Sequence, residues 1–567
     1  MTSADIIIIN ARVLTMNKAQ PRAEALAIAG NRIAAVGHKA DILALRAKHT
    51  RLIDAGMKTV MPGIVEGHVH LFGGSVELDS LMLNGINGFD RIAESVSQYR
   101  KSRPGPGIVV ATGIAHESFG RDTPITRQLL DRIVADVPFI AVCFDHHTVW
   151  ANTRAIEAAG VMRGRQLPTG NEIVLDAGGL ATGELREPAA YMFALALTPT
   201  GGREWLGMTT GENPVPPATT AERAIDEAYF RKGIAHAASL GITSMHNMDG
   251  NLYQLERLQA LLDRGELDAR VEVPFHQKSF FGIARLDEAV EWRAKYKGDM
   301  LHCGRVKVFI DGVLETLTAL MLDDYPGYPG NKGAPLFTAE EFNEIVTHAD
   351  RHGLQVSTHA IGDGGVRRTL DGYEAARRAN GSRDSRHRIE HIELIDPADI
   401  PRLKQLGVVA SLQPIAGVGV PGNPHEPILS RVGEKLPYAY AWQTLRDTGA
   451  MVAFSSDWPV APLDPWRTVY AAVTRIVPEV HPEGWIPEES ITVEEALAAY
   501  TTGSAHAEFT EREKGRLAQG YLADLVVLDR DPFAIPATEL EGVHAVMTIV
   551  GGRIVWSSGE IAGAETR

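Results

Sequence analysis

His68 and His70 are two histidines separated by a single residue, a residue type and a spacing that could bind a metal ion. They end the segment 60–70, which reads VMPGIVEGHVH. In an extended strand, side chains at i and i+2 point to the same face, so both imidazoles would project toward one point. Neutral imidazole is the commonest protein ligand for zinc and similar metals. The motif is short and arises by chance in a chain with 20 histidines, so the rest of the chain must support it.

Further polar side chains stand in or just after other predicted strands. These are Lys307, His359, His391 and Asp457. Taken singly, a histidine at a strand end is often a structural residue, and an aspartate there is often a helix cap. Lys307, between two valines, is harder to explain in that way, because a buried lysine needs a partner. In a parallel barrel, all these strand ends meet at one mouth, so we predict that the set converges on a metal centre.

The elements that must position these residues are short apolar strands separated by helical stretches. The strand candidates are 60–67, 241–246, 270–275, 305–310, 354–358, 387–390, 408–412 and 451–455. Capping boxes at Thr338 and Thr492 open two of the helices, which we expect Gly353 and Gly503 to end. Eight strand–helix repeats predict an α/β fold, a (β/α)8 TIM barrel. A doubly wound open sheet is the rival, but no Gly-x-Gly-x-x-Gly follows any strand.

Two regions depart from this repeat. About 170 residues separate the first two strands, against roughly 30 for a βαβ unit. We therefore predict an insertion at about 75–235 within a barrel spanning 59–507. Both ends of the chain read as short strands with tight turns, at 5–10, 25–29 and 32–36 and again at 523–528, 543–550 and 553–556. Residues 1–58 and 508–567 should thus form one small β-sandwich domain.

Composition excludes several classes of protein. Hydrophobic residues make up 44% of the chain and the net charge is −15, which argues against nucleic-acid or anionic-membrane surfaces. Only two cysteines occur, which suggests a reduced intracellular protein. The N-terminus lacks a basic segment before its four isoleucines, and no stretch approaches a membrane span. We expect a cytoplasmic protein and leave a homodimer open.

Two other histidine pairs compete with the strand-end set. His348 and His352 are four residues apart on the predicted helix 340–352 and could chelate a metal. We favour a structural role, because histidine suits a helix C-terminus and no third ligand is indicated. His146 and His147, after the apolar segment 139–144, are a second candidate, but adjacent side chains on a strand diverge.

The sequence resembles the metal-dependent amidohydrolase superfamily. Its first motif is the segment 62–70, PGIVEGHVH, and the strand-end Lys307, His359, His391 and Asp457 follow in that order. A closing segment at 520–528, GYLADLVVL, completes the match over nearly the whole chain. Within the insertion, DHHTVWAN at 145–152 and TGEL at 182–185 look like the branch called amidohydrolase family 3. That branch includes N-substituted formamide deformylases.

The resemblance implies a TIM barrel, a β-sandwich and one or two divalent metal ions, with Zn²⁺ as the expected metal. It implies that His68 and His70 hold one ion and that His359 and His391 hold a second. In binuclear members the equivalent of Lys307 carries a carbamate, an N6-carboxylysine, that bridges the metals. Bound metal lowers the pKa of its water to about 7. Asp457 would orient the resulting hydroxide, bind metal and pass the proton to the leaving nitrogen.

These inferences lead to a hydrolase acting on a carbon–nitrogen bond of an amide, other than a peptide bond, with an N-substituted formamide as one example. A deaminase or a cyclic amide or imide hydrolase of the same superfamily is the alternative. A non-catalytic, metal-free binding protein is a third, which the intact set of His, Lys and Asp disfavours. We expect the insertion to cover the barrel mouth, with His147, Tyr325 and Trp458 contacting a small-molecule substrate.

Overall fold

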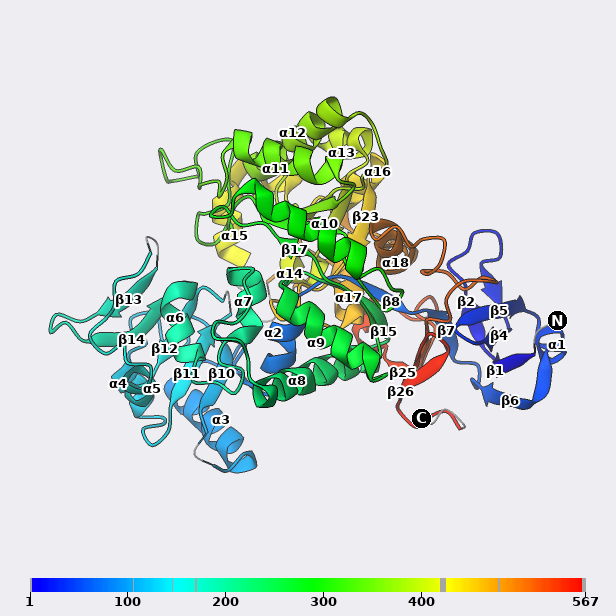
Figure 1. Ribbon diagram of the computed structural model, residues 1–567, viewed down its shortest axis with the longest axis horizontal. Coiled ribbons are helices and arrows are strands. Elements are labelled where there is room, and N and C mark those ends of the chain that lie inside the picture. Colours follow the sequence, from blue (N-terminus) through cyan, green and yellow to red (C-terminus); the bar gives the residue numbers. More distant parts are fainter. Residues whose placement is uncertain are drawn as a thin grey trace. The chain divides into compact units, whose positions relative to one another are not determined.

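The computed structural model (Figure 1) describes residues 3–105, 107–144, 146–168, 171–418, 425–477 and 480–562. The chain folds into two compact units. One comprises Met1–Leu71, Ile234–Val420 and Pro424–Arg567, and the other comprises Phe72–Gly233. Among the described residues, no helix combines the length and the apolar character that crossing a membrane requires.

Parallel strands form the centre of the first unit. In chain order they are β8 (Ile64–Val69), β15 (Ile242–Asn247), β16 (Arg270–Glu272), β17 (Phe275–His276), β19 (Arg305–Phe309), β20 (Gln355–Ala360), β21 (Arg388–His391), β22 (Val409–Leu412) and β23 (Met451–Phe454). β16 and β17 are two halves of one predicted strand, interrupted at Pro274, which has no N–H to donate. β16 pairs with β15 and β17 pairs with β19, so this segment joins the two parts of the sheet.

The first and last strands meet as well. Val69 and Trp458 form a parallel β-bridge. The backbone N–H of Asp457 donates to the carbonyl oxygen of His68 at 3.0 Å, and the N–H of His70 donates to the carbonyl oxygen of Trp458 at 2.7 Å. The strands therefore pair around a closed ring, which is an α/β, TIM-barrel-like arrangement. The seam between the first and last strands holds three of the predicted metal ligands, His68, His70 and Asp457.

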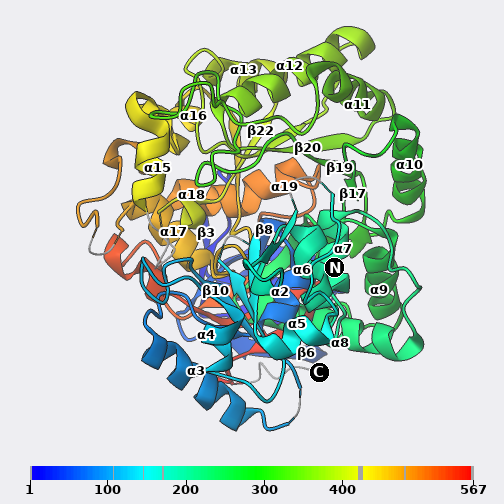
Figure 2. The same ribbon diagram turned by 90° about the vertical axis from the view of Figure 1, so that its left-hand side faces the viewer.

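Helices lie between these strands, as the alternating pattern predicts. They include α9 (Leu252–Asp263), α10 (Leu286–Lys295), α11 (Ala339–Arg351), α12 (Asp363–Asn380), α13 (Ile400–Leu406), α16 (Trp442–Asp447), α17 (Pro465–Thr474) and α18 (Val493–Ala498), several of which are visible in Figure 2. The capping box at Thr338 opens α11: its hydroxyl accepts from the Glu341 N–H, and the Glu341 carboxylate accepts from the Thr338 N–H. The local sequence thus determines where this helix begins.

The expectation that Gly503 ends a helix is wrong. After α18 the chain makes a π-helical turn, Ala499–Gly503, and continues into α19 (Ser504–Ala507). Gly503 has a helical φ of −68°, not the left-handed conformation of a C-terminal cap. A Cβ at Gly503 would overlap the carbonyl oxygen of Val452 in β23, so the glycine is there to let helix and strand pack closely.

The segment predicted as one strand, 60–67, is divided between two sheets. Its first half, β7 (Thr59–Pro62), pairs with β24 (Leu525–Leu528), and only the second half, β8, enters the ring of parallel strands. The break falls at Gly63, where a Cβ would overlap the side chain of Thr243. The barrel strand therefore begins at Ile64.

Both ends of the chain contribute strands to one pair of sheets. One sheet has the order β5–β4–β1–β6, and the other has the order β26–β25–β24–β7–β2–β3. The strands not yet given are β1 (Ala4–Ile9), β2 (Arg12–Leu14), β3 (Arg22–Ala23), β4 (Ala25–Ala29), β5 (Arg32–Gly37), β6 (Arg46–Asp54), β25 (Ala545–Val550) and β26 (Arg553–Ser557). In Figure 1 the red β25 and β26 lie close to the blue β7.

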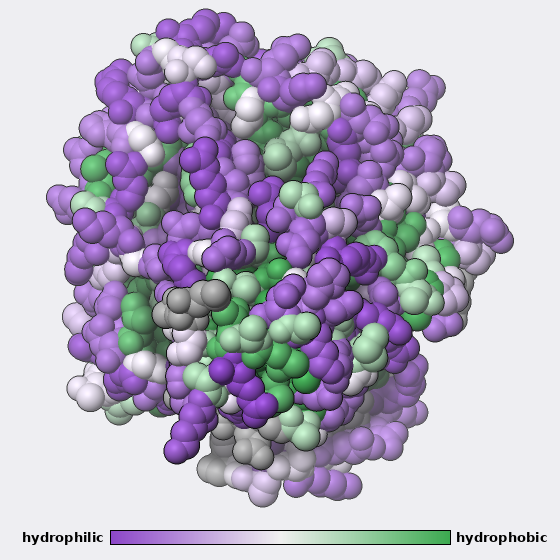
Figure 3. All heavy atoms as spheres, turned by 90° about the vertical axis from the view of Figure 1, so that its right-hand side faces the viewer, coloured by the Kyte–Doolittle hydropathy of each residue, from purple (hydrophilic) through white to green (hydrophobic). Residues whose placement is uncertain are grey.

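One hydrophobic core joins these two sheets. Ile8 and Leu26 from one sheet, and Val60, Val527 and Ile549 from the other, are all fully buried in it. Ile6 belongs to the same core, whereas Ile7 and Ile9 pack on the opposite face, which explains four consecutive isoleucines in a strand. In the view of Figure 3, hydrophilic residues cover most of the surface and hydrophobic ones form small groups among them.

The second unit has a mixed sheet of its own, with the order β13–β14–β12–β11–β10–β9. Its strands are β9 (Leu81–Met82), β10 (Val109–Ile114), β11 (Phe139–Cys143), β12 (Thr148–Ala151), β13 (Glu172–Leu175) and β14 (Ala181–Arg186). Alternate residues of β11 belong to two different hydrophobic clusters: Ile140 and Val142 to one, Phe139 and Ala141 to the other. The sheet is thus buried on both faces.

Two buried carboxyl groups in this second unit make its stability depend on pH. Burial and the neighbouring Glu204 raise the pKa of Glu77 to about 8, and burial raises the pKa of Glu204 to about 7. A carboxyl whose pKa is raised by folding stabilises the fold fully below its unfolded pKa, and this contribution is lost as pH rises through the folded pKa.

We therefore expect the Glu77→Gln variant to gain melting temperature relative to the native protein as pH rises from about 5 to about 9. The neutral amide replaces the protonated carboxyl at low pH and avoids an ionised one at high pH. Thermal melts of both proteins across this range measure the difference. A difference that does not change with pH would contradict the burial of a protonated Glu77.

Candidate metal centre

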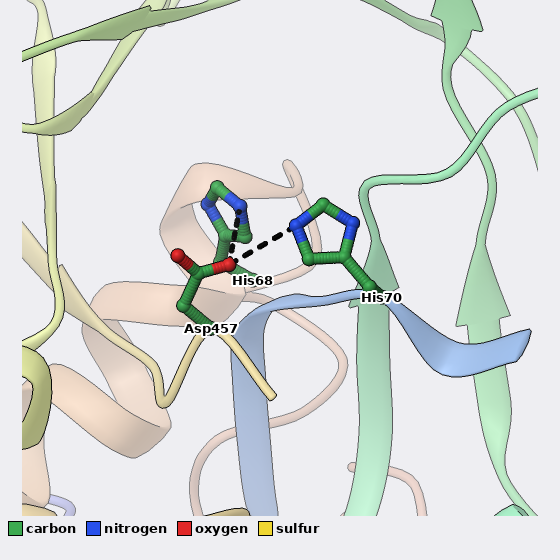
Figure 4. A group of neighbouring side chains, drawn as sticks. All are labelled: His68, His70 and Asp457. Carbon is green, nitrogen blue, oxygen red and sulfur yellow. Dashed lines mark ion pairs between the residues drawn. The ribbon is translucent and has the colours of Figure 1, made fainter. Parts of the chain in front are cut away.

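Three of the predicted ligands meet at the seam between the first and last barrel strands (Figure 4). Asp457 Oδ1 lies 3.2 Å from His68 Nε2 and 3.1 Å from His70 Nε2, and one ligand atom from each residue lies within 4.8 Å of the others. His68 and His70 face the same way because β8 alternates its side chains. Asp457 follows β23 in a left-handed backbone conformation, φ 64°, which is uncommon outside glycine.

Two more predicted ligands lie beside this group. The ring centroid of His391 is 5.1 Å from that of His68 and 4.6 Å from that of His359. His391, at the end of β21, also has a positive φ of 78°, so the backbone turns at the strand end. All four histidines and Asp457 are buried, and they come from the ends of four different strands.

A carboxylate stands behind three of the four histidines. His68 Nδ1 lies 2.8 Å from Glu390, His70 Nδ1 lies 2.7 Å from Asp249, and His359 Nδ1 lies 3.3 Å from Asp311. Because a carboxylate accepts, His68 and His70 present Nδ1–H to that partner and turn Nε2 toward Asp457. His359 Nδ1 and Asp311 are close enough for an ion pair but form no hydrogen bond. Histidines that ligate metals are typically oriented in this way.

The sequence analysis did not single out these three carboxylates. Asp311 and Asp249 each follow a barrel strand by two residues, and Glu390 immediately precedes His391. Reading every polar residue near a strand end, and not only the histidines, would have found them. Their pairing with particular histidines depends on the register of neighbouring strands.

The carboxylates are themselves held in place. Glu390 accepts from Ser357 and pairs with Arg388, whose Nε lies 2.9 Å from it. Burial alone would raise the pKa of Glu390, but Arg388 and His68 lower it well below its usual range, so it is ionised. Asp311 accepts from three backbone N–H groups, those of Leu320, Ile361 and Gly362.

Burial also sets the charge of the central residues. It lowers the pKa of His68 to about 4, with help from Lys307, and burial together with His359 holds the pKa of His391 well below its usual range. For His70, burial lowers the pKa, but Asp249 and Asp457 outweigh it and raise the pKa to about 9. Burial raises the pKa of Asp457, while the histidines bring it below its ordinary value. The group offers imidazole nitrogens and an ionised carboxylate, a donor set that fits a divalent metal such as zinc.

Comparison with known proteins agrees with this donor set. The pattern of the amidohydrolase family matches residues 51–556. The chain belongs to the amidohydrolase family. More closely, it falls in the branch called amidohydrolase family 3, as the resemblance in the sequence predicted. Membership makes it a metal-dependent hydrolase acting on amide carbon–nitrogen bonds.

Similar proteins cover nearly the full length of this amidohydrolase. An N-substituted formamide deformylase of Arthrobacter pascens is 26% identical over 563 residues, covering 97% of each chain. Protein LONG AFTER FAR-RED 3 of Arabidopsis thaliana is 29% identical, covering 97% of this chain and 91% of its own. A solved structure of an uncharacterized metal-dependent hydrolase from Pyrococcus horikoshii is 25% identical, with a TM-score of 0.74 over 94% of this chain and 99% of that one.

Lys307 of the amidohydrolase is fully buried in β19. Its Nζ has no hydrogen-bond partner among the residues that the structure describes, and it lies 4.8 Å from the ring centroid of Phe309. Burial lowers the pKa of Lys307 to about 8, although Glu390 and Asp457 oppose the shift. A second lysine that the sequence analysis missed, Lys278, lies 5.0 Å from the same ring. Burial and Lys307 lower the pKa of Lys278 to about 7.

The three predicted substrate contacts lie in different surroundings. Trp458 follows Asp457 directly, is buried, and has its ring 5.9 Å from that of His236. Tyr325 is buried and its hydroxyl donates to the carbonyl of Ala319 at 2.8 Å, so it holds its own loop together. His147 belongs to the second unit, where its Nδ1 lies 3.1 Å from Glu187.

The carboxylate behind His70 gives a direct test of metal binding. We expect Asp249→Asn to lower metal affinity about 10- to 100-fold, because the amide no longer favours the tautomer that presents Nε2. Competition with a chelator of known affinity measures the change. Glu24→Gln, which alters a surface carboxylate 3.6 Å from His38, is the matched control and should leave the affinity unchanged. Equal affinities in all three proteins would show that Asp249 does not support a ligand.

Proposed function

We propose that this amidohydrolase cleaves the carbon–nitrogen bond of a small-molecule amide, using Zn²⁺ held by His68, His70, His359, His391 and Asp457. The observation that carries the proposal is the group of His68, His70 and Asp457, in which carboxylates on Nδ1 of both histidines turn each Nε2 toward Asp457. A structural pair of histidines would not need both Nε2 atoms to converge on one carboxylate oxygen.

When bound, the ion would acidify water and polarise the substrate carbonyl. Asp457 is the proposed general base and acid. Its Oδ1 takes a proton from the attacking water and passes it to the leaving nitrogen, so that the amine departs neutral. Glu390 and Asp249 keep the imidazoles of His68 and His70 in one tautomer, and Arg388 keeps Glu390 ionised.

Lys307 is proposed to become carboxylated. Its neutral amine would attack carbon dioxide, forming a nitrogen–carbon bond and releasing one proton, and the carbamate oxygens would then be available as metal ligands. The buried Nζ supports this proposal, because burial lowers the pKa of Lys307 to about 8 and so favours the neutral amine that reacts with carbon dioxide. Without carboxylation the centre would hold a single ion.

For the substrate we propose an N-substituted formamide as the first candidate, on the strength of the full-length similarity to a formamide deformylase. His147, Tyr325 and Trp458 remain proposed substrate contacts, and the division into a terminal β-sandwich, a barrel and an insertion remains the proposed domain plan. The cytoplasmic location stays a prediction.

Metal analysis and a substrate screen test the proposal together. Purified protein should contain one or two divalent ions per chain, and chelation should abolish hydrolysis that added Zn²⁺ restores. The screen should include N-substituted formamides, acylated amines, cyclic amides and imides, and amino-substituted heterocycles. Activity only on the heterocycles would point to the alternative, a deaminase. Protein that takes up no metal and hydrolyses none of these compounds would refute the proposal.

A further inference from the structure

A second group of metal-ligand side chains lies outside the barrel, between α10 and α11. It consists of His348 and His352 near the end of α11 and of Asp287 in the first turn of α10. His348 Nε2 lies 3.2 Å from Asp287 Oδ1, and the two imidazole centroids are 4.6 Å apart. The sequence analysis assigned this histidine pair a structural role because no third ligand was indicated. Asp287, 61 residues earlier in the chain, supplies it.

The arrangement suits a chelate that spans two helices. Histidines at i and i+4 share one helix face, and α10 and α11 lie side by side in both ribbon views (Figures 1 and 2). One ligand atom from each residue lies within 4.8 Å of the others, against about 3.4 Å in a tetrahedral zinc site. Asp287 and His352 are exposed and His348 is partly exposed, so small side-chain rotations can close this gap while water fills the fourth position.

The helix end does not itself require the two imidazoles. Arg293 of α10 already donates to the carbonyl of Gly353, just beyond α11, at 2.6 Å. The carboxylate of Asp287 and the partial negative charge of the helix terminus both favour a cation at this position. His348 and His352 are therefore placed to bind one.

We propose that Asp287, His348 and His352 form a divalent transition-metal site that is separate from the barrel centre and links α10 to α11. Two imidazoles and a carboxylate select Zn²⁺, Ni²⁺ or Cu²⁺ over Mg²⁺ or Ca²⁺, which prefer oxygen ligands. The bound ion holds the start of α10 against the end of α11. The site also adds a second class of bound metal, with lower affinity, to the metal content measured for the whole protein.

The test uses the full-length protein with its barrel centre loaded first and unbound metal removed. Calorimetric titration with Zn²⁺ is compared for the native protein and for His352→Gln, His348→Gln and Asp287→Asn. Asp5→Asn is the matched control. Asp5 lies 3.5 Å from the exposed His49, but among the described residues this pair belongs to no group of three metal-ligand side chains. We expect one additional Zn²⁺ per chain in the native and control proteins, with affinity at least tenfold lower in the other three variants.

Hydrogen exchange supplies a local readout. Zn²⁺ should slow exchange at the end of α11 and the start of α10 in the native protein and not in His352→Gln. Native and His352→Gln proteins with the same stoichiometry, affinity and exchange would overturn the proposal. The result does not depend on the barrel centre, because every protein compared has the same barrel centre, loaded in the same way.

Discussion

We expect Asp457→Asn to lower turnover at least about 100-fold while much of the metal stays bound. The asparagine keeps the size of the side chain and an oxygen that faces His68 and His70, but it cannot accept a proton from water. His68→Ala has the opposite signature, because it removes a ligand and should lose metal together with activity. Steady-state kinetics and metal analysis of the same samples separate the two variants.

A neighbouring aspartate provides a control for this experiment. Asp464 lies in the same loop region and caps α17 by accepting from the Trp466 N–H at 2.9 Å. Asparagine is an equally good N-cap, so Asp464→Asn should leave both stability and turnover near native values. If Asp457→Asn also keeps near-native turnover, Asp457 is not the proton-transfer residue and the proposed mechanism fails.

We expect Lys307→Met to make the metal-free protein more stable and to lower the activity of the metal-loaded protein at least about tenfold. Methionine fills similar space without an amine, so the desolvation of a buried polar group, about 1–3 kcal/mol, is no longer required. The loss of activity follows because no carbamate can form. Denaturant unfolding of chelator-treated proteins measures the first effect, and kinetics after metal loading measure the second.

Metal content decides the role of Lys307. If the carbamate bridges two ions, Lys307→Ala binds one ion fewer than the native protein, and short carboxylic acids restore part of the loss by occupying the vacated space. Leu354→Ala, which truncates a fully buried side chain directly before β20, controls for general disturbance of the barrel. Unchanged metal content in Lys307→Ala would make Lys307 a structural lysine and the centre mononuclear.

The sequence located the residues of the centre because they all sit at strand ends. His68 and His70 could be paired from their spacing alone, and the barrel rule then brought His359, His391 and Asp457 toward the same mouth. Asp249, Asp311 and Glu390 could have been found by the same rule, but not their partners. Which carboxylate faces which imidazole depends on strand register and on backbone turns such as the positive φ of His391, and neither is encoded in local spacing.

The fold shows the same division between local and tertiary information. Capping at Thr338 is local, and the sequence located the start of α11 correctly. The break at Gly63 and the continuation through Gly503 depend on Thr243 and on Val452, which are distant in the chain. A glycine in the sequence indicates that a side chain is not tolerated, but not whether the cause is a turn or a neighbour.

The closing of the ring of strands by Val69 and Trp458 has a consequence for biosynthesis. His68 leaves the ribosome 389 residues before Asp457, which at ordinary translation speeds is an interval of about 20–80 s. Throughout that time the two imidazoles of β8 lack the last strand. β7 must wait longer still, because its partner β24 is made after β23. The nascent chain thus carries an exposed half-site, and the complete centre can be loaded only when synthesis is nearly finished.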